Sequence, residues 1–160
     1  MRHFPTIAYL IKHKFRVFVH SILMGVPLRG LLHDYSKISP IEYFGLGRQF
    51  YPSDPSEKEC NKGLFKKAKA HHIARSDHEL PHWYRDDGSC SEISESARRE
   101  TVCDWAAFQG FAFSLKGVRE NARKSYTRWA KDYRMHPTTR HWFEHFLELG
   151  EPEEGDRDSI

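Results

Sequence analysis

The sequence ESARRETVCDWAAFQGFAFSL, residues 95–115, has the periodicity of one long helix but carries an acid on its apolar face. With about 3.6 residues per turn, one narrow sector of this helix collects Ala97, Asp104, Phe108, Phe111 and Leu115. An isolated charged carboxylate among apolar side chains is costly, so Asp104 needs a metal ion, a cationic side chain or strong hydrogen-bond donors. The stretch predicts a buried helix that brings Asp104 either to a metal ion or to a buried arginine.

Helical periodicity continues over the rest of the chain, and no segment has the alternating pattern of a strand. We therefore predict an all-α fold, a single-domain helical bundle of about six or seven helices over residues 1–150. The other predicted helices span residues 5–24, 28–37, 58–77, 120–134 and 138–149, with one more beginning at residue 40. For that helix, Ser39, Pro40 and Glu42 supply an N-cap, a first-turn proline and a capping-box glutamate.

Composition narrows the class of protein. The 160 residues are 39% hydrophobic and 14% aromatic. This is enough apolar material to form one hydrophobic core without disulfide bonds or a structural metal ion. The three cysteines form no C-x-x-C pair, so a reduced, cytoplasmic protein is expected. No apolar run approaches the ~20 residues of a membrane span, and the basic residues near the N-terminus do not suit a signal peptide.

Charge is distributed unevenly along the chain. Residues 151–160 hold five acids against one arginine, and we predict that they form a disordered acidic tail. The rest of the chain is therefore more basic than the net charge of +3 indicates, which suits a phosphate-bearing ligand.

Further candidate metal ligands occur as His-Asp and as clustered histidines. His33 and Asp34 are adjacent near the end of a predicted helix, and imidazole with carboxylate suits a hard or borderline divalent ion. In the next long helix, His72 lies on the apolar face and His71 at its edge, and His78 follows two turns beyond His71. Because adjacent helical residues point apart, at most one of His71 and His72 binds a given ion. The other is expected to bind a second ion, contact substrate or face water.

The first helix supplies two more histidines. His13 and His20 share a face with Tyr9 and Arg16, opposite to the centre of an apolar stripe. That stripe consists of Ile7, Leu10, Ile11, Phe15, Phe18 and Ile22. Either His13 or His20 is expected to complete a metal site, with His13 favoured, and a ligand on that face requires the helix to be buried on both sides.

The order of these motifs resembles that of the HD-domain superfamily of metal-dependent phosphohydrolases. A closer resemblance, over about residues 8–145, is to a family of small uncharacterised bacterial and phage proteins. The family pattern HD-x-SK-x-SP-x-E, HH and E-x-x-x-DW is matched at residues 33–42, 71–72 and 100–105. Ser76 stands where the family has asparagine, and the first histidine lies closer to the His-Asp pair than in HD enzymes.

The resemblance implies an HD-domain-like fold and a phosphohydrolase that cleaves a nucleotide or related phosphate ester or phosphodiester with metal-activated water. One or two divalent ions (Mn, Co, Ni, Mg, Zn or Fe) would be bound by His13, His33, Asp34, His71, His72, His78 and Asp104. Asp34 or Glu100 would act as base or orient the water, whereas Lys37, Arg75 and Arg16 would neutralise the phosphate.

Two other classes of function are compatible with the sequence. A non-catalytic binding or interaction protein would use the same residues for a structural ion or a polar core, with no position left for water. An HD-type di-iron oxygenase would require iron. Nucleic-acid binding is a weaker variant that rests on Trp83, Tyr84, Arg85, Trp129 and the lysine run at 66–69.

Overall fold

The structure, a computed structural model, describes residues 3–50, 52 and 54–149. Its elements are α1 (His3–Leu23), α2 (Pro27–Leu32), the 3₁₀ turn η1 (Tyr35–Ile38), α3 (Pro40–Phe50), α4 (Pro55–Arg75), the 3₁₀ turn η2 (Leu80–Trp83), α5 (Glu95–Gln109), α6 (Leu115–Ser125), the π-helical turn η3 (Tyr126–Ala130) and α7 (Pro137–Phe146). The predicted all-α fold is confirmed over these residues, in which the one β-type pairing is an isolated bridge between Tyr84 and Cys90. None of the described helices combines the length and apolar character that crossing a membrane requires.

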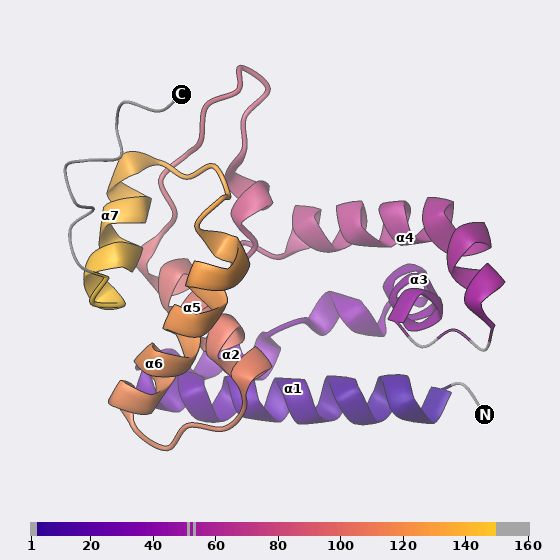
Figure 1. Cartoon of the computed structure of the whole chain (residues 1–160), viewed down its shortest axis with the longest axis horizontal. Helices are drawn as coiled ribbons and strands as arrows, with labels where there is room; N and C mark the ends of the chain where they lie inside the picture. Colours follow the sequence, from indigo (N-terminus) through magenta and orange to yellow (C-terminus); the bar gives the residue numbers. More distant parts are fainter. Residues whose placement is uncertain (1–2, 51, 53, 150–160) are drawn as a thin grey trace.

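The central helix is α5, which contacts α1, α2 and α6 (Figure 1). It begins at Ser94, whose side chain accepts a hydrogen bond from the N–H of Ala97 at 3.3 Å. Every residue from 100 to 107 is buried, including two acids, Glu100 and Asp104. The helix therefore carries both carboxylates into the interior, as its sequence pattern predicted for Asp104.

α5 ends at Gln109, six residues before the predicted end of this helix. Gly110 has a φ of +136°, a conformation that L side chains rarely adopt, and it turns the chain out of the helix. The next helix begins after Ser114, whose side chain accepts a hydrogen bond from Gly117 N–H at 3.1 Å. The predicted continuous helix over residues 95–115 was wrong, because glycine and a new N-cap intervene. Three members of its predicted apolar sector are exposed instead: Phe108, Phe111 and Leu115.

α1 buries the face on which its histidines lie. His13, Val17 and His20 are buried, and this side of the helix contacts α5. Much of the apolar stripe lies at the surface, with Ile7, Ile11, Phe15 and Ile22 all exposed. The requirement that the helix be buried on both sides was therefore wrong. α5 and the Gly110 turn supply polar partners for the histidines, so the histidine face packs inward.

A sharp turn at His33 and Asp34 replaces the predicted helix over residues 28–37. α2 ends at Leu32, and Asp34 adopts a left-handed conformation with φ of +57°. Asparagine and aspartate tolerate this region better than most residues do, but it is uncommon and is found often at functional sites. Gly30 allows α2 to approach α1, since a Cβ there would meet Ser21 Oγ at 1.9 Å.

The remaining boundaries differ from the predicted ones by a few residues. α4 begins at Pro55 because Asp54 caps it, accepting a hydrogen bond from Ser56 N–H at 2.7 Å. The predicted helix over 120–134 is replaced by α6 and η3, and the last helix ends at Phe146. The predicted stop at Gly150 and the acidic tail, residues 151–160, lie outside the described residues. With the N-terminal half of α1, α3 and α4 form an arm beside the α5–α7 body (Figure 1).

Candidate metal centre

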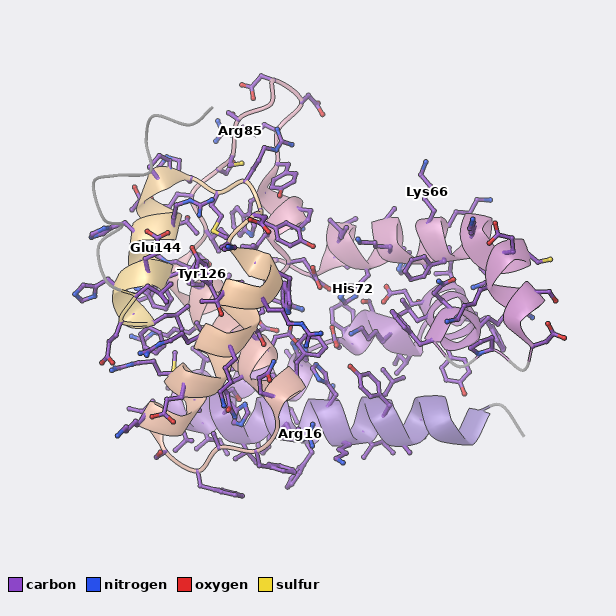
Figure 2. The ribbon with its side chains drawn as sticks, viewed as in Figure 1. Arg16, Lys66, His72, Arg85, Tyr126 and Glu144 are labelled. Atoms are coloured by element: carbon purple, nitrogen blue, oxygen red, sulfur yellow. The ribbon has the colours of Figure 1, made fainter. Side chains whose placement is uncertain are left out.

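Six side chains from separate parts of the chain converge in the interior between α1, α4 and α5. They are His13 of α1, His33 and Asp34 between α2 and η1, His72 of α4, His78 just after α4, and Asp104 of α5. We call these six residues the His/Asp cluster. Figure 2 shows His72 pointing from α4 toward the interior. Three groups of ligand atoms, drawn from these residues and Glu100, each lie within 4.8 Å of one another and are able to hold a metal ion.

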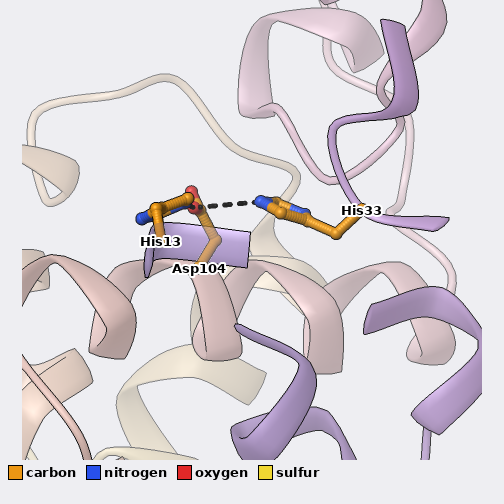
Figure 3. A group of neighbouring side chains, drawn as sticks. All are labelled: His13, His33 and Asp104. Carbon is orange, nitrogen blue, oxygen red and sulfur yellow. Dashed lines mark hydrogen bonds and ion pairs between the residues drawn. The ribbon is translucent and has the colours of Figure 1, made fainter. Parts of the chain in front are cut away.

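One side of the cluster consists of His13, His33 and Asp104 (Figure 3). Oδ1 of Asp104 lies 2.9 Å from Nε2 of His13 and 3.4 Å from Nε2 of His33. All three residues are buried. A single carboxylate oxygen thus faces two imidazole nitrogens from two other elements, which is a suitable ligand arrangement for a divalent ion.

Asp34 connects this side of the cluster to the other. Its Oδ2 lies 3.2 Å from Nε2 of His33, whereas its Oδ1 lies 3.3 Å from Nε2 of His72 and 3.7 Å from Nε2 of His78. The two oxygens of one carboxylate therefore face two different sets of imidazoles. The left-handed turn at Asp34 produces this position, because it directs the side chain between α4 and α5.

Two buried glutamates, Glu42 and Glu100, lie beside the Nδ1 atoms of three cluster histidines. Nδ1 of His33 donates to Glu100 Oε1 at 2.9 Å, and Nδ1 of His78 lies 3.2 Å from the same oxygen. Nδ1 of His72 donates to Glu42 Oε2 at 3.0 Å. A carboxylate on Nδ1 fixes the tautomer that leaves Nε2 as a lone pair, which is the usual support for a metal-binding histidine. The glutamates thus turn three Nε2 atoms toward the interior of the cluster.

The atoms at the centre fit a metal ion. His33 Nε2, His72 Nε2 and Asp34 Oδ1 are buried and make no hydrogen bond. Buried polar atoms are normally satisfied, and a nitrogen lone pair facing carboxylate oxygens requires a cation between them. That cation is either a proton or a metal ion. Nitrogen and oxygen donors of this kind suit Zn²⁺, Mn²⁺, Fe²⁺, Co²⁺ or Ni²⁺.

The pKa values of the metal-free cluster also indicate that its carboxylates favour a positive charge beside them. Burial alone would lower the pKa of His33, but the charge of Asp34 and the nearby carboxylate of Asp104 raise it well above its ordinary value. Burial opposes ionisation of Asp104, yet the hydrogen bond from His13 and the nearby imidazole of His33 hold the pKa of that carboxyl far below its usual range. The carboxylates therefore stay ionised and are able to hold a cation.

Of the predicted phosphate-binding cations, Lys37 adjoins the cluster. Its Nζ forms an ion pair with Asp34, and although burial opposes the charge, Asp34 raises the pKa of the Lys37 ammonium. Arg75 is exposed and lines a small cavity together with Asp34 and Glu100. Arg16 does not reach the cluster, since it donates to Ala107 O at 3.2 Å.

Two histidines named by the sequence lie outside the cluster. His20 is fully buried, but its Nδ1 donates to Cys103 O at 3.3 Å and its Nε2 accepts from Ala112 N–H at 3.0 Å. Both nitrogens are thus used by the backbone. His71 is half-buried, and its Nδ1 donates to Glu42 Oε1 at 2.5 Å. It supports the same glutamate as His72 without contributing to the three ligand groups.

Three residues around the cluster were missed or given another role from sequence. Glu42 was assigned to a capping box, but its buried carboxylate accepts from Ser36, His71 and His72, while the Ser39 N–H bonds to Ser36 O. Arg29 donates to Glu100 Oε2 at 2.6 Å and also pairs with Asp77. Glu79 places Oε1 3.4 Å from His72 Nε2. A fully buried glutamate at Glu42 has no local sequence signal, because its partners are brought by α4.

Comparison with family models places the chain in a family. It belongs to a family of unknown function, DUF5662, whose model matches residues 2–149. The expected membership of a small uncharacterised family is thus confirmed. Comparisons with curated proteins and with solved structures found no match.

Proposed function

We propose that this protein is a metal-dependent phosphohydrolase that cleaves a phosphate ester at the His/Asp cluster. The observation that carries the proposal is a set of three buried atoms that make no hydrogen bond: His33 Nε2, His72 Nε2 and Asp34 Oδ1. His72 Nε2 lies 3.3 Å from Asp34 Oδ1, and His33 Nε2 lies 3.2 Å from the other oxygen of Asp34. The order of the motifs, which resembles that of HD-domain phosphohydrolases, supports the same chemistry by analogy.

The cluster has donors for two ions. His13, His33 and Asp104 would hold one ion, and His72 and His78 would hold the other, with Asp34 contributing one oxygen to each. When bound, divalent ions supply Lewis acidity, which acidifies water and polarises a phosphoryl oxygen.

The surrounding side chains have separate tasks in this proposal. Lys37 neutralises negative charge on the phosphate, since its ammonium lies beside Asp34 at the edge of a large cavity. Glu79, whose side chain is 34% exposed and faces His72, accepts the proton of the attacking water. Glu100 orients His33 and His78, and Arg29 holds Glu100 in place. A base role for Glu100 is less favourable, because both its oxygens already accept from these groups.

Access to the cluster favours catalysis over a purely structural ion. A structural site is closed by protein ligands, whereas a catalytic site keeps a position for water or substrate. Asp104 and His78 line one large cavity, and His72 and Lys37 line another. Substrate therefore has a route to both sides of the cluster. An iron-dependent oxygenase would use the same ligands, and iron content with oxygen uptake distinguishes it.

The test combines metal analysis with ester hydrolysis. Untagged protein should contain or take up Mn²⁺, Co²⁺, Ni²⁺, Fe²⁺ or Zn²⁺, and the loaded protein should hydrolyse 4-nitrophenyl phosphate esters. Asp104→Asn should lose both properties, whereas Asp132→Asn, at an exposed turn position, should keep both. Lys37→Met should keep the metal and lose turnover by ~10²-fold, the scale for one transition-state charge contact. Lys12→Met is its exposed control. Metal uptake without hydrolysis of any ester would contradict the proposal.

A further inference from the structure

Two large cavities meet the His/Asp cluster from different sides. The first, which we call the polar cavity, has a volume of about 590 Å³ and reaches Asp104 and His78 between η2, α5 and η3. The second, the apolar cavity, has a volume of about 600 Å³ and reaches His72 and Lys37 between α1, α3 and α4. Glu79, Phe108 and Tyr133 line both and form the wall between them. Each cavity is large enough for an organic group of small-ligand size.

The polar cavity is suited to a planar polar group. Trp129 forms part of its wall and is held edge-on by Trp105, with ring centroids 5.9 Å apart, and by Phe108. Gln109 and Arg128 add an amide and a guanidinium to the same lining. A rigid indole next to hydrogen-bonding side chains is a suitable surface for a heterocyclic base, which stacks through its face and bonds through its edge.

The apolar cavity differs in its chemistry. Its far wall is formed by Leu46, Phe50 and Phe65, and the rings of Phe50 and Phe65 meet edge to face at 5.9 Å. Lys37 and His72 line it where it reaches the cluster, and Lys69 is a further charged residue of its lining. A group bound here would thus have an apolar or aromatic body and an anionic end at the cluster.

We propose that the substrate is an unsymmetrical phosphodiester, with a nucleoside-like group in the polar cavity and a bulky apolar or aromatic group in the apolar cavity. A phosphomonoester has one organic group and would fill one cavity only. A diester has two groups on opposite sides of its phosphate and fills both. This inference rests on the proposed function, because it assumes that the phosphate lies at the cluster.

The reaction is hydrolysis at phosphorus. The oxygen of water forms a new P–O bond, and the P–O bond to one of the two organic groups breaks. The departing alkoxide or phenoxide takes up one proton, and the other proton of water remains on the phosphate or is released. The products are one phosphomonoester and one alcohol or phenol, without any change in oxidation state.

Matched esters test the two-group requirement. With metal-loaded protein, the 4-nitrophenyl ester of thymidine 5′-monophosphate should be hydrolysed with kcat/KM at least ~10-fold above bis(4-nitrophenyl) phosphate and 4-nitrophenyl phosphate. Independently of catalysis, metal-free protein should bind the phenyl ester of thymidine 5′-monophosphate ~10-fold more tightly than thymidine 5′-monophosphate itself. Quenching of tryptophan fluorescence reports this binding, because Trp129 lines the polar cavity.

Exposed residues in each cavity permit variants that leave the core intact. Phe50→Ala should lower kcat/KM for the nucleoside diester about 3- to 10-fold by removing one aromatic wall. Arg128→Ala should weaken binding of both thymidine compounds about threefold or more. Phe113→Ala, on the exposed loop after α5, and Lys124→Ala, one turn before Arg128, are controls that should change nothing.

The outcomes separate this inference from the proposed function. If metal-dependent hydrolysis is found but monoesters match or exceed the diester, the two-group substrate is wrong while the phosphohydrolase stands. If the phenyl ester binds more tightly than the monoester but nothing is hydrolysed with any metal, the two-cavity site stands and the proposed function fails. If the protein neither binds nor hydrolyses these esters, both are overturned.

Discussion

A comparison of two buried histidines on α1 tests whether the His/Asp cluster binds metal. His13 and His20 lie two turns apart, with 3% and 0% of their surfaces exposed. His13 faces Asp104 in the cluster, whereas His20 is hydrogen bonded to backbone groups of Cys103 and Ala112. We expect His13→Gln to remove most metal binding and His20→Gln to leave metal binding intact while lowering stability.

The expected sizes follow from linkage. At a metal concentration of 100 times Kd, binding stabilises the wild type by about 2.7 kcal/mol, which for a domain of this size raises Tm by about 5–11 °C. Loss of one ligand raises Kd by roughly 100-fold, so the same concentration stabilises His13→Gln by only about 0.4 kcal/mol, or about 1 °C. His20→Gln breaks two buried hydrogen bonds and should lower the metal-free Tm by about 2–12 °C.

The assay is thermal unfolding of protein stripped with chelator, with and without added Mn²⁺, alongside calorimetric titration of the same ion. The informative quantity is the metal-dependent shift in Tm within each variant, because the metal-free Tm values differ. The reasoning is refuted if His13→Gln keeps the full shift, or if His20→Gln loses it as completely as His13→Gln does. The second result would show that α1 packing alone governs metal binding.

Three further perturbations probe the support of the site and the fold. Glu42→Gln should weaken metal binding about 10- to 100-fold, measured by titration, since Glu42 holds Nδ1 of His72. Gly45→Ala should destabilise the protein by about 1–3 kcal/mol in denaturant unfolding, because the new Cβ would lie 2.5 Å from a Cβ of α4, whereas Gly63→Ala, with no atom within 4 Å of its Cβ, should stabilise it by about 0.5–1 kcal/mol. Burial lowers the pKa of His20, so as pH falls below about 6.5 the unfolded chain takes up a proton that the folded chain does not. The free energy of unfolding of the wild type should therefore fall between pH 7 and 5. In His20→Gln the slope of that fall should be smaller by up to about 1.4 kcal/mol per pH unit.

Each of these has an outcome that contradicts its reasoning. Unchanged metal affinity in Glu42→Gln would mean that the hydrogen bond to Nδ1 does not govern how His72 binds. Equal effects of alanine at positions 45 and 63 would mean that α3 and α4 do not pack as closely as described. An unaltered pH slope in His20→Gln would mean that this ring titrates normally, against its use of both nitrogens by the backbone.

The sequence alone determined the helical class and the chemistry of the central helix. The spacing of apolar residues specified an all-α chain. The position of Asp104 two turns after Ala97 required a buried partner, although Phe108, Phe111 and Leu115 of the predicted sector are exposed. The spacing on α4 likewise put His72 inward and His71 at the edge, which the structure also has. These inferences succeed because helical periodicity is local, and a residue's face depends only on its neighbours along the chain.

Tertiary structure decided which histidine of α1 joins the cluster, and which glutamates support it. His13 and His20 lie on the same face, so only the approach of α5 and the Gly110 turn separates a cluster histidine from one bonded to the backbone. The sequence predicted a capping role for Glu42, but in the fold α4 places His72 within hydrogen-bond distance of its carboxylate. A ligand histidine on α1 was expected to require burial of both sides of the helix, but much of the apolar stripe is exposed, because α5 supplies polar partners to the histidine face. Such pairings join residues up to 92 positions apart, and no local pattern encodes them.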